Sequence, residues 1–256
     1  MPPIIVAASA FAPDTEVGAR GQDALVPILK DVRADGIEIR RELFGERETG
    51  LAMDRLKEAV ANSGLLAVYS APVEMWGADG TWNEREMETA YDEAQRLGAF
   101  LLKTSLGRFD PARSDLEALR RLIERGRIVV AVENDQTEYG GTVEALSHYF
   151  RACRERNIPA KMTFDIGNWH WTGEDPLEAA ERFSEHVGYI HCKHAEKRDG
   201  AWIGLPLPAE SNARWREVLA ALPRDVPLAI EYPIDGENLR ESTKREIDKL
   251  RQAAYR

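Results

Sequence analysis

The chain has 256 residues, of which 43% are hydrophobic and 30% are charged. This composition is typical of a folded globular protein and excludes a disordered chain. No stretch approaches the roughly 18 consecutive apolar residues of a membrane helix, and a formal net charge of −10 disfavours binding to the phosphates of nucleic acid. We therefore expect neither a membrane nor a nucleic acid as partner.

The N-terminus and the cysteines bear on the cellular compartment. The apolar run Ile4–Ser9 has no Lys or Arg before it, so it lacks the positive segment of a signal peptide and is better interpreted as a first strand. Cys153 and Cys192 are too few for a disulfide framework. Both features predict a cytoplasmic protein with free thiols.

Eight short segments rich in apolar and β-branched residues recur roughly every 30 residues, the length of a strand, a crossover helix and the return. The predicted strands are Ile4–Ser9, Gly36–Arg40, Leu65–Ser70, Phe100–Ser105, Ile128–Glu133, Lys161–Asp165, Gly188–Cys192 and Pro227–Tyr232. Eight such units predict an α/β fold, a single-domain (β/α)8 TIM barrel over residues 1–256, a fold of about 250 residues. An open doubly wound sheet shows the same alternation, but its usual glycine-rich nucleotide-binding motifs are missing.

Apolar residues three and four positions apart predict helices between the strands, as in residues 25–32. Two helix starts carry a capping-box pattern. Ser114 is followed by Glu117, and Asp175 is followed by a proline and then Glu178. We expect these helices to pack around the barrel.

Ionisable side chains lie at the ends of the last four strands. The carboxyl ends of barrel strands build the active site, so the four side chains should meet on one side of the barrel mouth. Three carboxylates are not easily ionised together there unless a cation neutralises them. The pattern predicts one divalent metal ion, Mn²⁺ before Mg²⁺, Co²⁺ or Zn²⁺, although each residue alone would equally suit an exposed loop. The predicted ligands are Glu133, Asp165, His191 and Glu231.

Other charged side chains near the predicted mouth are candidate substrate contacts. Lys103 is a charge within the apolar strand FLLKTS, and Lys193 points to the same side of its strand as His191. Lys193 would equally suit a solvated strand end. Glu38 and Arg40 share one face of the second strand, where an internal ion pair is the favoured interpretation and a contact to substrate by Arg40 is the alternative.

The loop after Asp165 adds further candidates. Asn168, Trp169 and His170 follow that strand directly, and aromatic rings with hydrogen-bonding neighbours suit a sugar. The full set of predicted substrate contacts is Arg40, Lys103, Asn168, Trp169, His170 and Lys193.

Five short motifs resemble the xylose isomerase-like TIM barrel superfamily, which contains sugar and sugar phosphate isomerases and epimerases. They are DGIEIR at Asp35–Arg40, VEN at Val132–Asn134, FDIGN at Phe164–Asn168, HCKH at His191–His194 and IEYP at Ile230–Pro233. The similarity covers almost the whole chain. It is not specific to one substrate.

The resemblance implies that the four predicted ligands hold one divalent ion, with Glu133 and Glu231 also acting as acid–base groups on opposite sides of a sugar. The implied reaction is isomerisation or epimerisation of a small sugar, sugar phosphate or hydroxy-keto acid, by proton transfer through an enediolate. Because barrels of this superfamily often pair, the resemblance is also compatible with a homo-oligomer.

Three other functions fit a similar barrel. A dehydratase of the inositol or dehydroshikimate type would use the same kind of metal site. An endonuclease for abasic DNA needs further histidines on the third and fourth strands, where this chain has YSAP and LKTS. A non-catalytic sugar-binding barrel would have lost part of a ligand set that is complete here. We rank the dehydratase second and the other two last.

Overall fold

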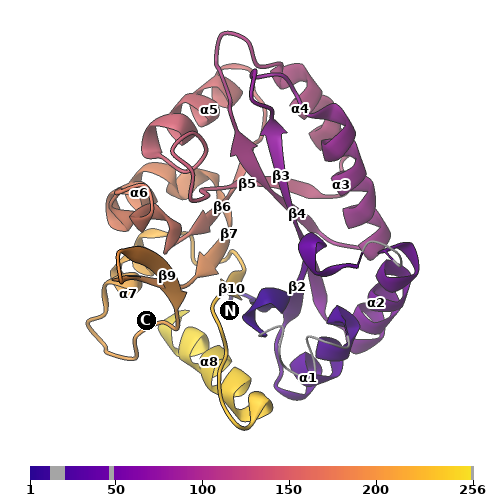
Figure 1. Ribbon diagram of the computed structural model, residues 1–256, viewed down its shortest axis with the longest axis vertical. Helices are drawn as coiled ribbons and strands as arrows, with labels where there is room; N and C mark the ends of the chain where they lie inside the picture. The colour runs from indigo at the N-terminus through magenta and orange to yellow at the C-terminus, as the bar shows by residue number, and fades with distance from the viewer. Residues whose placement is uncertain (12–20, 46–48, 255–256) are drawn as a thin grey trace.

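A closed barrel of parallel strands forms the centre of the molecule in the computed structural model, which describes residues 1–11, 21–45 and 49–254 (Figure 1). Within these ranges the strands follow the order β1-β10-β7-β6-β5-β4-β3-β2, and each pair of neighbours is parallel. The barrel strands are β1 (Ile4–Ala7), β2 (Gly36–Arg40), β3 (Leu66–Trp76), β4 (Leu101–Gly107), β5 (Val129–Glu133), β6 (Lys161–Asp165), β7 (Val187–Cys192) and β10 (Leu228–Ile230). The predicted TIM barrel is confirmed.

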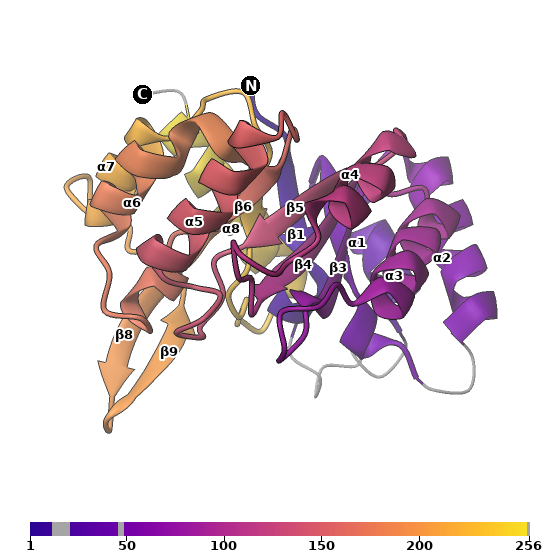
Figure 2. The ribbon, with the colours of Figure 1, turned by 90° about the horizontal axis from the view of Figure 1, so that it is seen from above.

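Helices surround the barrel, as Figure 2 shows from above. The α-helices are α1 (Leu25–Asp31), α2 (Thr49–Ser63), α3 (Glu84–Leu97), α4 (Leu116–Glu124), α5 (Val143–Glu155), α6 (Pro176–Phe183), α7 (Arg214–Ala221) and α8 (Leu239–Ala254). Short 3-10 turns are η1 (Ala8–Ala10), η3 (Gln22–Ala24), η4 (Arg41–Leu43), η5 (Asn168–His170) and η6 (Ser184–His186). In the described part of the chain, no helix has the length and apolar character needed to cross a membrane.

The two predicted helix caps differ in outcome. The Asp175 carboxylate accepts hydrogen bonds from backbone N–H groups in the first turn of α6, as predicted. At α4 the cap is Asp115, which accepts from the N–H of Glu117 at 2.9 Å. The Ser114 hydroxyl instead donates to the carbonyl of Gly80 at 2.9 Å. The predicted cap at Ser114 is therefore wrong by one residue, because its hydroxyl is used to hold a neighbouring loop.

A two-stranded hairpin, β8 (His194–Arg198) and β9 (Ala201–Leu205), lies outside the barrel sheet and was not predicted. Figure 2 shows it projecting from the body near α6 and α7. Its turn is Asp199–Gly200, with φ of 50° and 85°. An Asp-Gly pair with two positive φ angles is a strong hairpin signal. The sequence therefore contained the information to predict this hairpin.

An apolar floor closes the inside of the barrel below its mouth. Successive side chains of a strand point in opposite directions, so every second residue faces inward. Six buried residues from six strands form this floor as a cluster separate from the main core: Ile5, Val68, Leu101, Ala131, Tyr189 and Ala229. Two residues further along four of these strands come Lys103, Glu133, His191 and Glu231. The alternation that builds the floor therefore also aims these ionisable groups into the mouth.

Candidate metal centre

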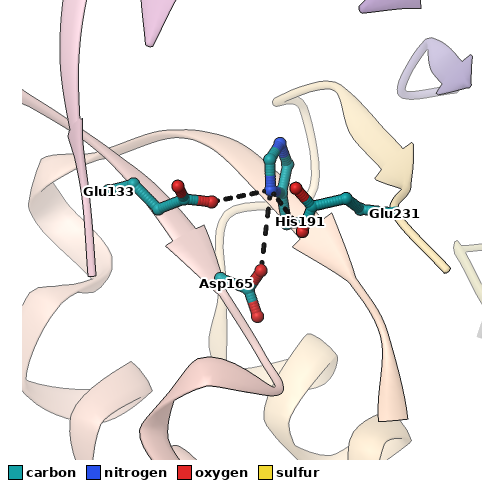
Figure 3. Close-up of side chains that lie close together, drawn as sticks. All are labelled: Glu133, Asp165, His191 and Glu231. Carbon is teal, nitrogen blue, oxygen red and sulfur yellow. Dashed lines mark ion pairs between the residues drawn. The ribbon is translucent and has the colours of Figure 1, made fainter. Parts of the chain in front are cut away.

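The four predicted ligands converge at the barrel mouth (Figure 3). One donor atom from each of Glu133, Asp165, His191 and Glu231 lies within 4.8 Å of the others. His191 Nδ1 lies 2.8 Å from Glu133 Oε1, 3.1 Å from Glu231 Oε2 and 3.6 Å from Asp165 Oδ2. In the view of Figure 3, the two glutamates approach Nδ1 from opposite sides and Asp165 approaches from below. The arrangement is a compact set of three carboxylates and one imidazole.

Glu38 fixes the orientation of His191. Its Oε2 lies 2.6 Å from His191 Nε2 and accepts a hydrogen bond from the Tyr189 hydroxyl at 2.8 Å. A carboxylate on the outer nitrogen of a histidine is a common support for metal ligands, because it fixes the ring and its tautomer. Nδ1 is thereby left facing the cluster. The sequence predicts Glu38 only as an ion-pair partner for Arg40, and its contact with His191 is a role that the sequence reasoning misses.

The donor atoms fit a metal ion. Buried polar atoms normally have hydrogen-bond partners, yet Glu133 Oε1, Asp165 Oδ2 and His191 Nδ1 are buried and form only close ion-pair contacts, without a hydrogen bond of normal geometry. Metal–ligand bonds of about 2.1 Å place neighbouring donors roughly 3.0–3.5 Å apart, close to the distances from His191 Nδ1. Donor atoms that gather around one point without normal hydrogen bonds are what a cation site requires.

Asp165 is held rigidly by the loops around it. Asn134 accepts a hydrogen bond from the Asp165 N–H at 2.8 Å and donates to its carbonyl at 3.0 Å. Asp165 Oδ1 accepts from the backbone N–H groups of Gly167 and Asn168 at 2.8 and 2.9 Å. The Asn168 amide donates to the carbonyl of Asn134 and accepts from Gln136. Asn168 is thus a buried support for Asp165, and its predicted contact with substrate stays a prediction.

Two lysines pair with the carboxylates. Lys103 Nζ forms an ion pair with Oε2 of Glu133, and both side chains are buried. Lys193 Nζ lies 2.8 Å from Asp165 Oδ2 and 2.8 Å from Glu231 Oε2. Both lysines lie at the mouth as predicted, but their ammonium groups are already engaged with the candidate ligands.

Arg40 completes the charge balance of the mouth. Arg40 Nη1 lies 2.9 Å from Glu38 Oε1, which confirms the predicted ion pair, and 2.7 Å from Glu231 Oε1. The carboxylates of Glu38, Glu133, Asp165 and Glu231 count −4, and Arg40, Lys103 and Lys193 count +3. Burial alone would lower the pKa of His191, but the surrounding glutamates raise it well above its usual value, so a protonated His191 brings the sum to zero. The sequence alone predicts that a metal ion neutralises the carboxylates. The structure shows internal cations that already balance them, so the case for a metal rests on the convergence of the four donor groups.

The charges also shift the acid–base properties of the two glutamates. Burial by itself raises the pKa of Glu133, but Lys103 and His191 outweigh burial and hold that pKa below its usual value. Burial likewise acts against ionisation of Glu231, yet the charges of His191 and Lys193 keep its pKa well below the usual range. Both glutamates are therefore ionised at neutral pH, the state in which a carboxylate accepts a proton or binds a cation.

Trp169 and His170 differ in position. Trp169 is fully buried and packs between Phe164 and Phe183, with the Phe183 ring parallel at 6.0 Å. It belongs to the packing between the barrel and α6, and its predicted contact with substrate stays a prediction. His170 stacks on Trp202 of the β8–β9 hairpin at 5.3 Å and lines a cavity of about 420 Å³. It remains a candidate for contact with a ligand.

The chain belongs to the xylose isomerase-like TIM barrel family, whose sequence model matches residues 26–253. The closed parallel barrel agrees with this assignment. No curated protein matches the chain in sequence.

Solved structures share the fold at low sequence identity. The IOLI protein, in a structure with a binding zinc atom, has a TM-score of 0.74 and 13% identity, over 99% of this chain and 98% of that one. D-Psicose 3-epimerase from Clostridium cellulolyticum H10, in a structure with D-tagatose, has a TM-score of 0.69 and 12% identity, over 99% of both chains. D-Allulose 3-epimerase from Methylomonas sp. has a TM-score of 0.68 and 14% identity, over 98% of this chain and 97% of that one. At such identities the likeness demonstrates a common fold.

Proposed function

We propose that this protein is a divalent-metal-dependent isomerase or epimerase of a small sugar, sugar phosphate or hydroxy-keto acid. The observation that carries the proposal is the convergence of four donor groups from consecutive strand ends, with one donor atom of each within 4.8 Å of the others. The epimerases among the structural neighbours support the same class of reaction.

Glu133, Asp165, His191 and Glu231 would hold the ion. Three carboxylates and one imidazole form an oxygen-rich set that suits Mn²⁺ first, although the zinc atom of the IOLI protein makes Zn²⁺ a strong alternative. When bound, such an ion polarises a carbonyl group and stabilises the negative charge that develops on its oxygen.

The two glutamates supply the proton transfer. Glu133 and Glu231 lie on opposite sides of the cluster in Figure 3, and cations keep both ionised. One carboxylate removes the proton from the carbon next to the carbonyl, which gives an enediolate. Return of a proton to the other face of the same carbon produces an epimer, and return to the adjacent carbon interconverts an aldose and a ketose.

The cations of the mouth suit the charge that forms during this reaction. Arg40 and Lys103 are buried or nearly so beside the two glutamates, where the low dielectric strengthens their attraction for an anionic oxygen. We assign them to binding and orienting the oxygens of the substrate, with His170 at the edge of the neighbouring cavity. A phosphate or carboxylate on the substrate would meet the same positive groups.

The test combines metal analysis of the purified protein with a screen of small ketoses, aldoses and hydroxypyruvate in deuterated water. We expect Mn²⁺ or Zn²⁺ near one ion per chain and metal-dependent deuterium exchange at a carbon next to a carbonyl. Loss of water, seen as a product 18 mass units lighter by the standard masses of the atoms, would instead identify a dehydratase.

Substitutions separate catalysis from fold. Glu133→Gln and Glu231→Gln should each reduce exchange by at least about a hundredfold, the usual weight of a general acid–base group. Glu196→Gln on the exposed hairpin is the matched control and should leave exchange unchanged. If the protein binds no divalent ion, or if exchange persists in both glutamine variants, the proposed function is wrong.

A further inference from the structure

We propose that Lys193 is an internal counter-ion that occupies the metal-facing oxygens of the site and moves away when a divalent ion binds. This inference rests on the proposed function, because it concerns the same metal site. It adds a two-position lysine that sets how tightly the ion is held.

Lys193 contacts the oxygens that a metal ion would use. Its Nζ lies 2.8 Å from Asp165 Oδ2 and 2.8 Å from Glu231 Oε2, the two oxygens that face His191 Nδ1. An ion bound to these oxygens at about 2.1 Å would lie within a few ångströms of the ammonium group. Two positive charges so close in a buried site repel strongly, so the ammonium group and the ion compete for the same place.

The two other cations of the mouth contact different oxygens. Lys103 pairs with Oε2 of Glu133, whereas Oε1 is the oxygen near His191 Nδ1. Arg40 pairs with Oε1 of Glu231, whereas Oε2 faces the cluster. Each of these two cations therefore neutralises a ligand through the oxygen that faces away from His191 Nδ1, and it leaves the oxygen near Nδ1 without contact to itself. Of these three cations, Lys193 alone competes directly with a metal ion.

Gly167 provides space for the Lys193 side chain. A Cβ atom at this position would lie 2.7 Å from Lys193 Cγ and 3.2 Å from Cε, closer than packed atoms allow. Gly167 has φ of −82° and ψ of −36°, a conformation open to any residue, so the backbone does not require glycine here. The glycine of the FDIGN motif is thus explained by the close approach of the lysine.

A neighbouring cavity gives the side chain a second position. Lys193 lines the 420 Å³ cavity together with His170, Trp202 and Glu210. The face of Trp202 and the carboxylate of Glu210 both suit an ammonium group. Rotation of the side chain toward this cavity would release Asp165 and Glu231.

Chemical labelling tests the movement directly in the unaltered protein. Reductive methylation followed by mass spectrometry would be run with and without saturating Mn²⁺, with the exposed Lys197 of the hairpin as internal reference. We expect labelling of Lys193 relative to Lys197 to rise about tenfold or more with Mn²⁺, and buried Lys103 to stay protected in both conditions. Unchanged labelling of Lys193 under conditions where calorimetry shows bound Mn²⁺ would overturn the inference.

Metal affinity provides the second readout. Lys193→Met removes the competing charge at similar side-chain volume, and we expect calorimetry to show Mn²⁺ binding tightened by about tenfold or more, or 1.4 kcal/mol. Lys103→Met removes the same charge from behind Glu133 and should tighten binding distinctly less. Equal tightening in both variants would mean general electrostatics and would contradict competition. Absence of Mn²⁺ binding in both wild type and Lys193→Met would instead contradict the proposed function itself.

Discussion

The floor and the mouth of the barrel are built from the same strands and differ completely in chemistry. Leu101 and Ala131 in the floor are apolar and buried, and two residues further on each strand come Lys103 and Glu133, also buried. The floor gains stability from close apolar packing, which is not directional. The mouth requires a partner for each charge, and Arg40, Lys103 and Lys193 supply partners for its carboxylates. The comparison teaches that one period-two pattern can place a stabilising layer directly beneath a reactive one.

The largest effect on stability is expected in the floor. Leu101→Ala removes most of a side chain that is 1% exposed. Because the surrounding strands of a closed barrel cannot move in to fill the cavity, the free energy of unfolding should fall by about 2–5 kcal/mol. Denaturant titration measures this change. The matched variant Leu66→Ala, at an exposed position on β3, should change stability by less than about 0.5 kcal/mol. Similar losses in both variants would mean that the floor contributes no special packing.

In the mouth we expect a larger effect on metal affinity than on stability. Glu38→Gln weakens the support of His191 Nε2, and outer partners of metal ligands typically contribute 10–100-fold in affinity, about 1.4–2.7 kcal/mol. Calorimetric titration with Mn²⁺ measures it. Glu42→Gln is the control, because Glu42 pairs with the same Arg40 from a position that is 39% exposed. Equal affinities for the two variants would contradict the assigned role of Glu38.

The region of the mouth around Lys193 should be as tightly packed as the floor. Gly167→Ala places a methyl group 2.7 Å from Lys193 Cγ and should cost about 1–3 kcal/mol in thermal unfolding, as overpacked sites do. In Gly204→Ala the added Cβ would lie 3.7 Å from Lys193 Cδ, an ordinary contact, and we expect almost no change. If both variants unfold alike, the glycine of FDIGN has another explanation.

The sequence predicted the barrel well because its main signals are local and repeated. The strand bounds Gly36–Arg40 and Lys161–Asp165 agree with the structure, since alternation and flanking turns define them. The predicted eighth strand was too long, because β10 spans only Leu228–Ile230 and Glu231 comes just after it. The side chain of Glu231 nevertheless reaches the cluster, so the error did not affect the predicted ligand set.

Contacts across the barrel could not be predicted from the sequence. Glu38 on β2 and His191 on β7 are 153 residues apart, and no local pattern indicates that they meet. Trp169 and His170 are adjacent in one loop, yet Trp169 is fully buried between the barrel and α6, whereas His170 lines a cavity. Orientation within a loop depends on which helices pack beside it. These residues were therefore identified from the sequence, but their partners were not.

The smallest effect on stability is expected for Asp175, a surface carboxylate outside the barrel, in contrast to the buried carboxylates of the mouth. Asp175 caps α6 and pairs with Arg214 on the surface. Burial alone would raise the pKa of Asp175, but hydrogen bonds from the backbone N–H groups of Leu177 and Glu178, together with Arg214, lower it. A carboxylate whose pKa is lower in the folded state stabilises the fold above its unfolded pKa of about 3.9, and that contribution is lost as pH falls through the folded value.

Asp175→Asn isolates this charge, because asparagine caps a helix about as well as aspartate. We expect wild type to be more stable by a few tenths of a kcal/mol, at most about 1, above pH 5, since the pair is screened by solvent. The difference should shrink as pH falls below about 3.9 and vanish once pH lies below the lowered folded pKa, where the aspartate is protonated in both states. Denaturant titrations of both proteins across this range measure it, and a difference that persists at low pH would show that the cap rather than the charge had changed. The contrast with Glu38 follows from burial, because water competes for the partly exposed Asp175, whereas the Glu38 side chain is fully buried.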